Sequence, residues 1–181
     1  MIALKKVSNV DTEKQAAQFL LLMDWLAQAG YEHYEISNFA KPGFRSKHNS
    51  SYWRSTPYIG IGPSAHSFNG NNVRRWNVSN NAAYINSLKN NIIPFTEEKL
   101  SHIQRLNEYI MISLRTLEGI DLNIIKEKFG EDKMQQLQEA GKKYVDNHKL
   151  QTINCKLTLT NQGKLFADGI AADLFFEEII A

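Results

Sequence analysis

The strongest constraint on the fold is an amphipathic helix that leads directly into a strand. Apolar side chains recur at three- and four-residue steps from about Thr12 to Ala29, which is the spacing of one helical face. Gly30 stands where a helix commonly ends, and the strand-forming run 31–36 follows it at once. A helix, a glycine and a strand in this order are typical of α/β architecture. We therefore expect a mixed α/β (α+β) chain.

The rest of the sequence divides near residue 95. Residues 37–57 predict a long loop, and a turn at 69–72 predicts a β-hairpin. From Thr96 onward the spacing of apolar residues predicts a long helix, Glu97–Leu117. Two more helices, a second hairpin and a closing helix follow it, which is the order of a winged-helix-like module. We expect one domain over residues 1–95 and a helical, winged-helix-like domain over residues 96–181.

Composition excludes several classes of protein. Cys155 is the only cysteine among 181 residues, so neither a disulfide framework nor a three-cysteine iron–sulfur motif is present. No apolar run is long enough to cross a bilayer, and the first residues do not form a signal peptide. We expect a reduced, cytoplasmic setting. Cys155 falls in a turn between two short strands and has no evident partner.

The charges are unevenly placed. The sequence has 21 Lys and Arg against 19 Asp and Glu, yet no Asp or Glu occurs in residues 36–96, where about six are expected. This acid-free segment alternates cations with aromatic residues, which suits a large planar anion or an RNA strand with stacked bases. The alternative is that the aromatic residues fill a core and the cations are solvated. The cations are Lys41, Arg45, Lys47, Arg54, Arg74 and Arg75, and the aromatic residues are Phe44, Tyr52, Trp53, Tyr58, Phe68 and Trp76.

Two histidines, His48 and His66, lie in the same segment. An imidazole can bind iron or carry a proton, and a purely structural hydrogen-bonded role is the alternative for each. The second half of the chain is net acidic, and acids surround the helix that would contact DNA in a winged-helix module. We therefore expect no nucleic-acid partner.

Three motifs in the acid-free segment and just before it carry a family resemblance. They are Tyr34–Gly43, the HNxxYW pattern of His48–Trp53, and Tyr58–Ser67. Together they closely resemble the oxygen-independent coproporphyrinogen III oxidase-like family of radical S-adenosylmethionine proteins (HemW/HemN), and most closely its haem-chaperone branch. Residues from about 97 onward resemble the C-terminal domain of that family, and Thr158–Leu165 resembles the closing segment of that domain.

The resemblance implies a fold and a set of cofactors. Residues 1–95 would be the last β/α units of a partial barrel, and the chain would be the C-terminal part of a longer protein. The CxxxCxxC motif that holds the family's iron–sulfur cluster has no counterpart here, nor do the segments that hold S-adenosylmethionine. The cluster and S-adenosylmethionine are therefore expected in the intact protein only, and no catalytic residue is expected in this chain. Whether the parent is an enzyme stays open.

The resemblance also implies binding residues. The family's HNxxYW motif contacts haem, which carries over to His48, Asn49, Tyr52 and Trp53. His48 is then the candidate axial ligand of the haem iron, and Ala40 is expected near S-adenosylmethionine in the intact protein. Three cations of the acid-free segment are candidate partners of the haem propionates. They are Arg45, Arg54 and Arg74.

The function implied by the resemblance is haem binding and delivery. One alternative is oxidative decarboxylation of coproporphyrinogen III to protoporphyrinogen IX by the intact protein. A second alternative is an RNA-binding or structural module. The partners implied are a tetrapyrrole (haem or porphyrin), a haem-accepting protein and peripheral membrane partners of the intact protein.

Overall fold

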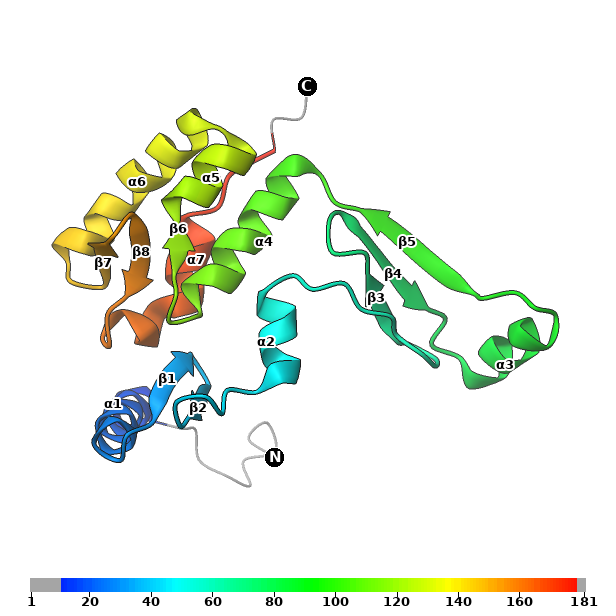
Figure 1. Ribbon diagram of the computed structural model, residues 1–181, viewed down its shortest axis with the longest axis horizontal. Helices are drawn as coiled ribbons and strands as arrows, with labels where there is room; N and C mark the ends of the chain where they lie inside the picture. The colour runs from blue at the N-terminus through cyan, green and yellow to red at the C-terminus, as the bar shows by residue number, and fades with distance from the viewer. Residues whose placement is uncertain (1–10, 179–181) are drawn as a thin grey trace. The chain divides into compact units, whose positions relative to one another are not determined.

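The computed structural model describes residues 11–178, and the chain divides into two compact units (Figure 1). Unit 1 holds the described residues up to Arg45 together with Ser113–Leu174, and unit 2 holds Ser46–Ile112 with the described residues 175–178. Both units contain helices and strands, so the expected mixed class is confirmed. No helix within residues 11–178 is long and apolar enough to cross a membrane.

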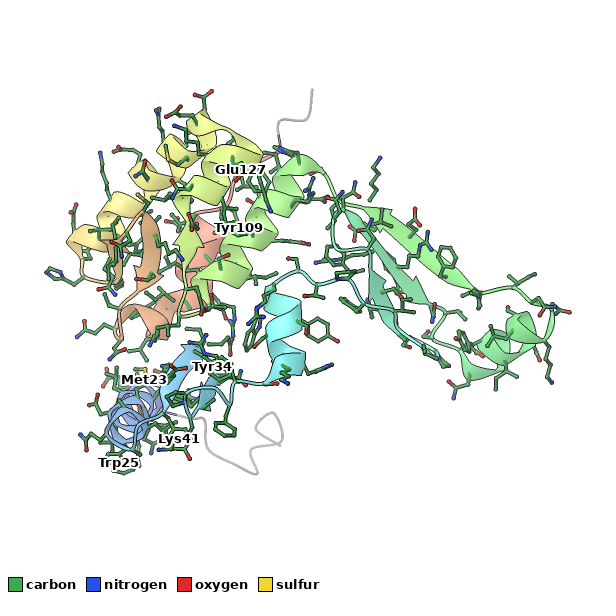
Figure 2. All side chains as sticks on the ribbon, viewed as in Figure 1. Met23, Trp25, Tyr34, Lys41, Tyr109 and Glu127 are labelled. Carbon is green, nitrogen blue, oxygen red and sulfur yellow. The ribbon has the colours of Figure 1, made fainter. Side chains whose placement is uncertain are left out.

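The first part of unit 1 matches the predicted helix and strand. α1 (Thr12–Gln28) begins at Asp11, whose carboxylate accepts hydrogen bonds from the first free N–H groups of the helix. The chain then turns through Gly30 (φ +74°) into β1 (Glu32–Glu35), which pairs antiparallel with β2 (Asn38–Ala40). Met23 and Tyr34 are buried, whereas Trp25 is exposed (Figure 2).

The second part of unit 1 contains a three-stranded antiparallel sheet and several helices. Its strands lie in the order β6-β8-β7. Apolar residues from its strands and α-helices are almost fully buried and form the core, among them Ile120, Ile125, Leu137, Leu150 and Ile170. The elements are β6 (Ile120–Asp121), α5 (Leu122–Phe129), α6 (Glu131–Asp146), β7 (Leu150–Ile153), β8 (Lys156–Leu159), the 3-10 helix η1 (Gly163–Phe166) and α7 (Ala167–Asp173).

Backbone contacts hold the two sequence segments of unit 1 together. Ile36 N–H donates to the carbonyl of Arg115 over 3.0 Å, and Leu117 N–H donates to the carbonyl of Tyr34 over 3.1 Å. The end of β1 is thereby paired with the residues that follow α4 (His102–Leu114). One compact unit thus forms from residues that lie about 80 positions apart in the sequence.

Unit 2 contains a second three-stranded antiparallel sheet, in the order β3-β4-β5. The predicted hairpin is confirmed, because the Asn69 side chain accepts hydrogen bonds from three consecutive backbone N–H groups in the turn between β3 and β4. The expected loop 37–57 is wrong in part, since β2 and α2 lie within it. The elements of unit 2 are α2 (Lys47–Trp53), β3 (His66–Phe68), β4 (Val73–Asn77), α3 (Asn81–Lys89), β5 (Phe95–Lys99) and the first part of α4 (His102–Leu114).

The predicted helix Glu97–Leu117 is corrected by the structure. Its first residues form β5 instead, where Glu97 pairs with Arg75 of β4 and Glu98 pairs with Arg74. Cross-strand pairing of opposite charges stabilises the strand and overrides the helix propensity of this run. α4 begins only after Ser101, whose hydroxyl accepts from the N–H of Gln104 while Gln104 Oε1 accepts from the N–H of Ser101.

The expected domain boundary near residue 95 and the division into compact units differ. The division falls inside α4, between Ile112 and Ser113. A helix can be divided between two compact units because residues near its start and residues near its end contact different parts of the chain. The boundary between residues 95 and 96 stays a prediction.

Candidate functional site

The HNxxYW motif lies on a short capped helix. Ser46 Oγ accepts a hydrogen bond from the N–H of Asn49 over 3.2 Å and so begins α2. Residues four apart lie on the same face of a helix, so His48 shares a face with Tyr52, and Asn49 shares a face with Trp53. The signal was present in the sequence as a serine followed by residues at helical spacing, within the segment that was predicted to be a loop.

The side chains of His48 and Tyr52 are exposed and lie edge to face. The ring centroids of His48 and Tyr52 lie 5.2 Å apart at an interplanar angle of 87°. Edge-to-face contacts of this kind fix the orientation of both rings. Both side chains are exposed, so one imidazole edge of His48 remains accessible.

Two further rings extend this pair. Tyr52 contacts Tyr58 edge-on with centroids 5.0 Å apart, and Tyr58 lies 6.4 Å from Phe68. The backbones of Tyr58 and Phe68 exchange two hydrogen bonds of 3.0 and 2.9 Å, which holds Tyr58 against β3. We call His48, Tyr52, Tyr58 and Phe68 the aromatic row. Its last two members lie in the aromatic-rich segment but were not among the predicted site residues.

Arg74 lies at the far end of the aromatic row. Its guanidinium carbon is 5.8 Å from the Phe68 ring centroid, within the range of a cation–π contact. Arg74 Nη1 also forms an ion pair of 2.7 Å with Glu108 of α4. Burial raises the pKa of Glu108, and the charge of Arg74 acts in the opposite direction. Glu108 was not predicted as part of the site, and nothing local to the sequence of β4 points to it.

Other cations of the acid-free segment are also paired with carboxylates. Arg45 binds Glu32 over 3.0 Å and Glu118 over 2.6 Å, which raises the pKa of its guanidinium. Arg75 binds Glu97 over 2.7 Å. Arg54 is exposed and has no ion pair with another residue of the described chain.

The acid-free segment is therefore not an acid-free surface. Arg45, Arg74 and Arg75 each form an ion pair with a carboxylate, because acids from outside the segment reach them. The physical reason is that antiparallel strand pairing and helix packing bring distant residues together, which spacing along the chain does not reveal.

The predicted site residues fall in both compact units. His48, Asn49, Tyr52, Trp53, Arg54 and Arg74 belong to unit 2. Arg45 belongs to unit 1, as does Ala40, which is buried at the end of β2 opposite Glu32. The structure brings His48, Tyr52 and Arg74 into one row. Roles for Ala40, Asn49 and Trp53 stay predictions.

The described residues do not fit an iron–sulfur cluster. Cys155 is exposed in the turn between β7 and β8, and a single thiolate is too few for a cluster. Within residues 11–178 no three His, Cys, Asp or Glu side chains converge to hold a metal. His66, on β3, is exposed and lies beside Trp76 rather than in the aromatic row.

Comparison with known proteins defines the class. Residues 100–166 match the family model of the HemN C-terminal domain. The fold is similar to the solved structure described as "Coproporphyrinogen III oxidase (HemN) from Escherichia coli is a Radical SAM enzyme", with a TM-score of 0.64 and 15% sequence identity over 85% of this chain and 39% of that one. The chain therefore has a HemN-type C-terminal domain and fold.

Curated relatives narrow the assignment. The chain is 28% identical over 159 residues to "Heme chaperone HemW" of Bacillus subtilis, covering 87% of this chain and 42% of the relative. It is 38% identical over 97 residues to the protein of the same name from Synechocystis, covering 52% and 24%. The resemblance found in the sequence is confirmed: the chain is similar to the HemW/HemN family in its HemN C-terminal domain, in its curated relatives and in its fold. It spans about two fifths or less of the length of these relatives.

Proposed function

We propose that this chain acts in haem handling, as a tetrapyrrole-binding part of a haem chaperone, and that the aromatic row is its haem site. The observation that carries the proposal is the exposed His48–Tyr52 pair on α2, within a row of rings that ends at Arg74. The names of the curated relatives as haem chaperones support the ligand class.

The chemistry of each side chain suggests its role. The exposed imidazole of His48 supplies an axial nitrogen to the haem iron, and Tyr52 supplies apolar contact to the macrocycle. Arg54 is the first candidate for a propionate because no carboxylate of the described chain neutralises it. Arg74 and Arg45 bind propionates only by exchanging carboxylates that they already hold.

The finer fold that we propose is the C-terminal part of a partial β/α barrel followed by a winged-helix-like domain. The succession of β6, α5, α6, β7 and β8, with sheet order β6-β8-β7, supports the second domain. The likeness to the HemN structure supports the first. In this proposal the iron–sulfur cluster and S-adenosylmethionine belong to other parts of the intact protein, and haem passes to an accepting protein.

The alternatives have less support. Nucleic-acid binding needs uncompensated cations, whereas β5 places Glu98 and Glu97 opposite Arg74 and Arg75. Oxidative decarboxylation by the intact protein has less support because the curated relatives reported above are named haem chaperones. Haem binding is the function that the described residues support best.

Titration of the full chain with ferric haem tests the proposal. We expect a Soret shift on binding, and we expect His48→Ala to remove the shift and to weaken binding on the order of tenfold, about 1.4 kcal/mol. His66→Ala is the matched control, because His66 is exposed in the same unit and outside the row. Equal spectra and affinities for His48→Ala and the native chain would exclude His48 as the ligand.

A second titration tests the contribution of the haem propionates to binding separately from that of the iron. Arg54→Gln is expected to weaken binding of haem several-fold and to leave binding of haem dimethyl ester unchanged, because esterification removes the carboxylates. If Arg54→Gln affects both ligands equally, the side chain does not pair with a propionate.

A further inference from the structure

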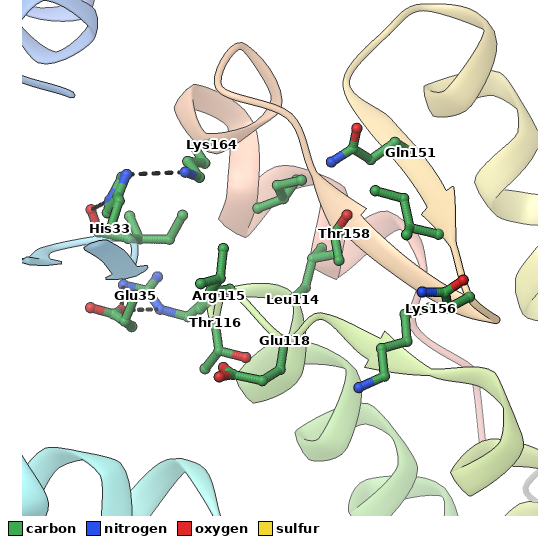
Figure 3. Close-up of a pocket in the computed structure, with 15 residues that line it drawn as sticks. His33, Glu35, Leu114, Arg115, Thr116, Glu118, Gln151, Lys156, Thr158 and Lys164 are labelled. Carbon is green, nitrogen blue, oxygen red and sulfur yellow. Dashed lines mark hydrogen bonds and ion pairs between the residues drawn. The ribbon is translucent and has the colours of Figure 1, made fainter. Parts of the chain in front are cut away.

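Unit 1 contains a cavity that the haem proposal does not use. It has a volume of about 350 Å³ and lies between the end of β1, the residues after α4, the hairpin β7–β8 and η1 (Figure 3). This volume is within the roughly 300–1,000 Å³ of small-molecule sites. Much of its lining is apolar and comes from Ile36, Leu114, Leu117, Ile153 and Leu159.

His33 at one side of the cavity is held as a neutral imidazole. Its Nε2 lies 2.9 Å from the carbonyl oxygen of Ile36, and since a carbonyl only accepts, Nε2 carries the proton. Nδ1 is then an acceptor, and it lies 3.1 Å from Lys164 Nζ. The ring stacks on Phe39 with centroids 4.0 Å apart, which fixes its orientation.

Lys164 is the charged residue of the cavity lining that has no ion pair among the described residues. Its ammonium donates to His33 and, over 3.2 Å, to Asn161 Oδ1, and both partners are neutral. Burial lowers the pKa of Lys164, and no carboxylate of the described residues forms an ion pair with it. An ammonium has three donors, so one remains for a ligand.

The other charges of the lining are paired. Glu35 binds Arg115 over 3.0 Å, and Arg115 also binds Asp168. Glu118 binds Arg45 over 2.6 Å. Lys156 lies 3.8 Å from Asp121. A negative ligand would therefore be attracted at Lys164 rather than elsewhere in the cavity.

A second unsatisfied polar group lies in the lining. Thr158 Oγ1, on β8, is buried without a hydrogen-bond partner among the described residues. A buried hydroxyl without a hydrogen-bond partner is unfavourable, and a ligand oxygen would supply the missing partner. The cavity thus combines apolar walls with one unpaired cation and one unpaired hydroxyl.

We propose that this cavity is a binding site for a small amphipathic carboxylate. The carboxylate forms an ion pair with Lys164, and the apolar body lies against Leu114 and Leu159. Thr158 donates a hydrogen bond to a ligand oxygen. None of the residues that line the cavity belongs to the aromatic row.

The test uses 4-phenylbutyrate and its neutral amide as probes on the full chain, followed by calorimetry and by NMR shifts of backbone amides and methyl groups. We expect saturable binding of the carboxylate, with shifts at Leu114, Thr158 and Leu159, and at least roughly tenfold weaker binding of the amide. Equal affinity for the two probes, or shifts confined to the aromatic row, would overturn the proposal.

Variants of Lys164 and Thr158 distinguish a loss of the binding charge from a loss of the folded structure. Lys164→Gln should reduce the affinity for the carboxylate to that for the amide, whereas Lys164→Arg should retain the preference. Lys142→Gln, an exposed change on α6, is the matched control. Thr158→Val should weaken carboxylate binding without lowering stability, because the hydroxyl has no partner to lose. If Lys164→Gln does not fold, Thr158→Val and Lys164→Arg decide: unchanged binding in the first or lost preference in the second contradicts the site.

Discussion

Glu35 is a buried charged residue of unit 1. Its side chain is 4% exposed, and its carboxylate accepts from Arg115 over 3.0 and 3.1 Å and from the N–H of Ser37 over 2.9 Å. Removing one partner of a buried ion pair leaves the other uncompensated, which is more costly than losing an exposed pair. Glu35 thereby joins β1 to the segment that follows α4.

The first prediction concerns this pair. Glu35→Gln is expected to lower the free energy of unfolding by about 2–4 kcal/mol, measured by urea denaturation. Glu118→Gln is the control, because that carboxylate is half exposed and its pair with Arg45 should contribute at most about 1 kcal/mol. Losses of similar size in the two variants would contradict the assignment.

The second prediction concerns His33 and pH. Burial lowers the pKa of His33 below its ordinary value of 6.5, and the charge of Lys164 acts in the same direction. As pH falls through 6.5, the unfolded chain takes up a proton that the folded chain takes up only at lower pH. The unfolded state then binds more protons, so stability decreases as pH falls and levels off below the lowered pKa.

Urea unfolding at several pH values between about 5 and 7.5 measures this effect. His33→Gln should show a weaker decrease of stability toward acid than the native chain, because the titrating group is gone. His66→Ala, which changes an exposed histidine, should keep the native slope. The same slope in native chain and His33→Gln would rule out His33 as the source.

At the scale of elements, two glycines of unit 1 have opposite roles. Gly119 precedes β6 with φ +70°, and a Cβ there would collide with the carbonyl oxygen of Leu157 on the paired strand β8. Gly169 lies inside α7 in open space. A glycine is required at the first position, whereas at the second it only adds entropy to the unfolded chain.

The third prediction follows from this contrast. Gly119→Ala should destabilise the chain by at least about 2 kcal/mol, while Gly169→Ala should stabilise it by roughly 0.5–1 kcal/mol. Thermal unfolding followed by circular dichroism measures both. A neutral Gly119→Ala variant would mean that β6 and β8 do not approach as closely as described.

Some elements were predictable from local signals and others were not. The hairpin closed by Asn69 and the helix that begins after Asp121 lie where turn and cap residues indicate. The start of α4 was misplaced at Thr96, although Ser101 and Gln104 form the actual capping box. β5 was missed because its stability depends on β4, which lies some 20 residues earlier.

At the scale of the whole molecule, residues 46–99 contribute less to the buried apolar core than unit 1 does. The core side chains of unit 1 are almost fully buried. In the described residues 46–99, by contrast, none of the apolar side chains belongs to the buried core, and Ile59 and Ile61 are 85% and 89% exposed. Regions with few buried apolar contacts have a lower free energy of local unfolding.

The fourth prediction is a difference in hydrogen exchange. Backbone amides of β3, β4 and β5 should exchange faster, on the order of tenfold or more, than those of α5, α6 and β8. Exchange followed by mass spectrometry on the full chain measures both sets at once. Equal protection in the two sets would show that the β3-β4-β5 sheet is stabilised as strongly as the core of unit 1.

The sequence by itself determined the mixed fold class, most helices and hairpins, and the family resemblance. These depend on residues a few positions apart, such as Ser46 capping α2 and the HNxxYW spacing. Only the tertiary structure decided which arginines are neutralised, since Glu108 and Glu118 reach Arg74 and Arg45 from distant segments. It also decided that Lys164 lies beside a neutral His33. Charge and packing act through space, so a pattern along the chain does not show which cations remain unpaired.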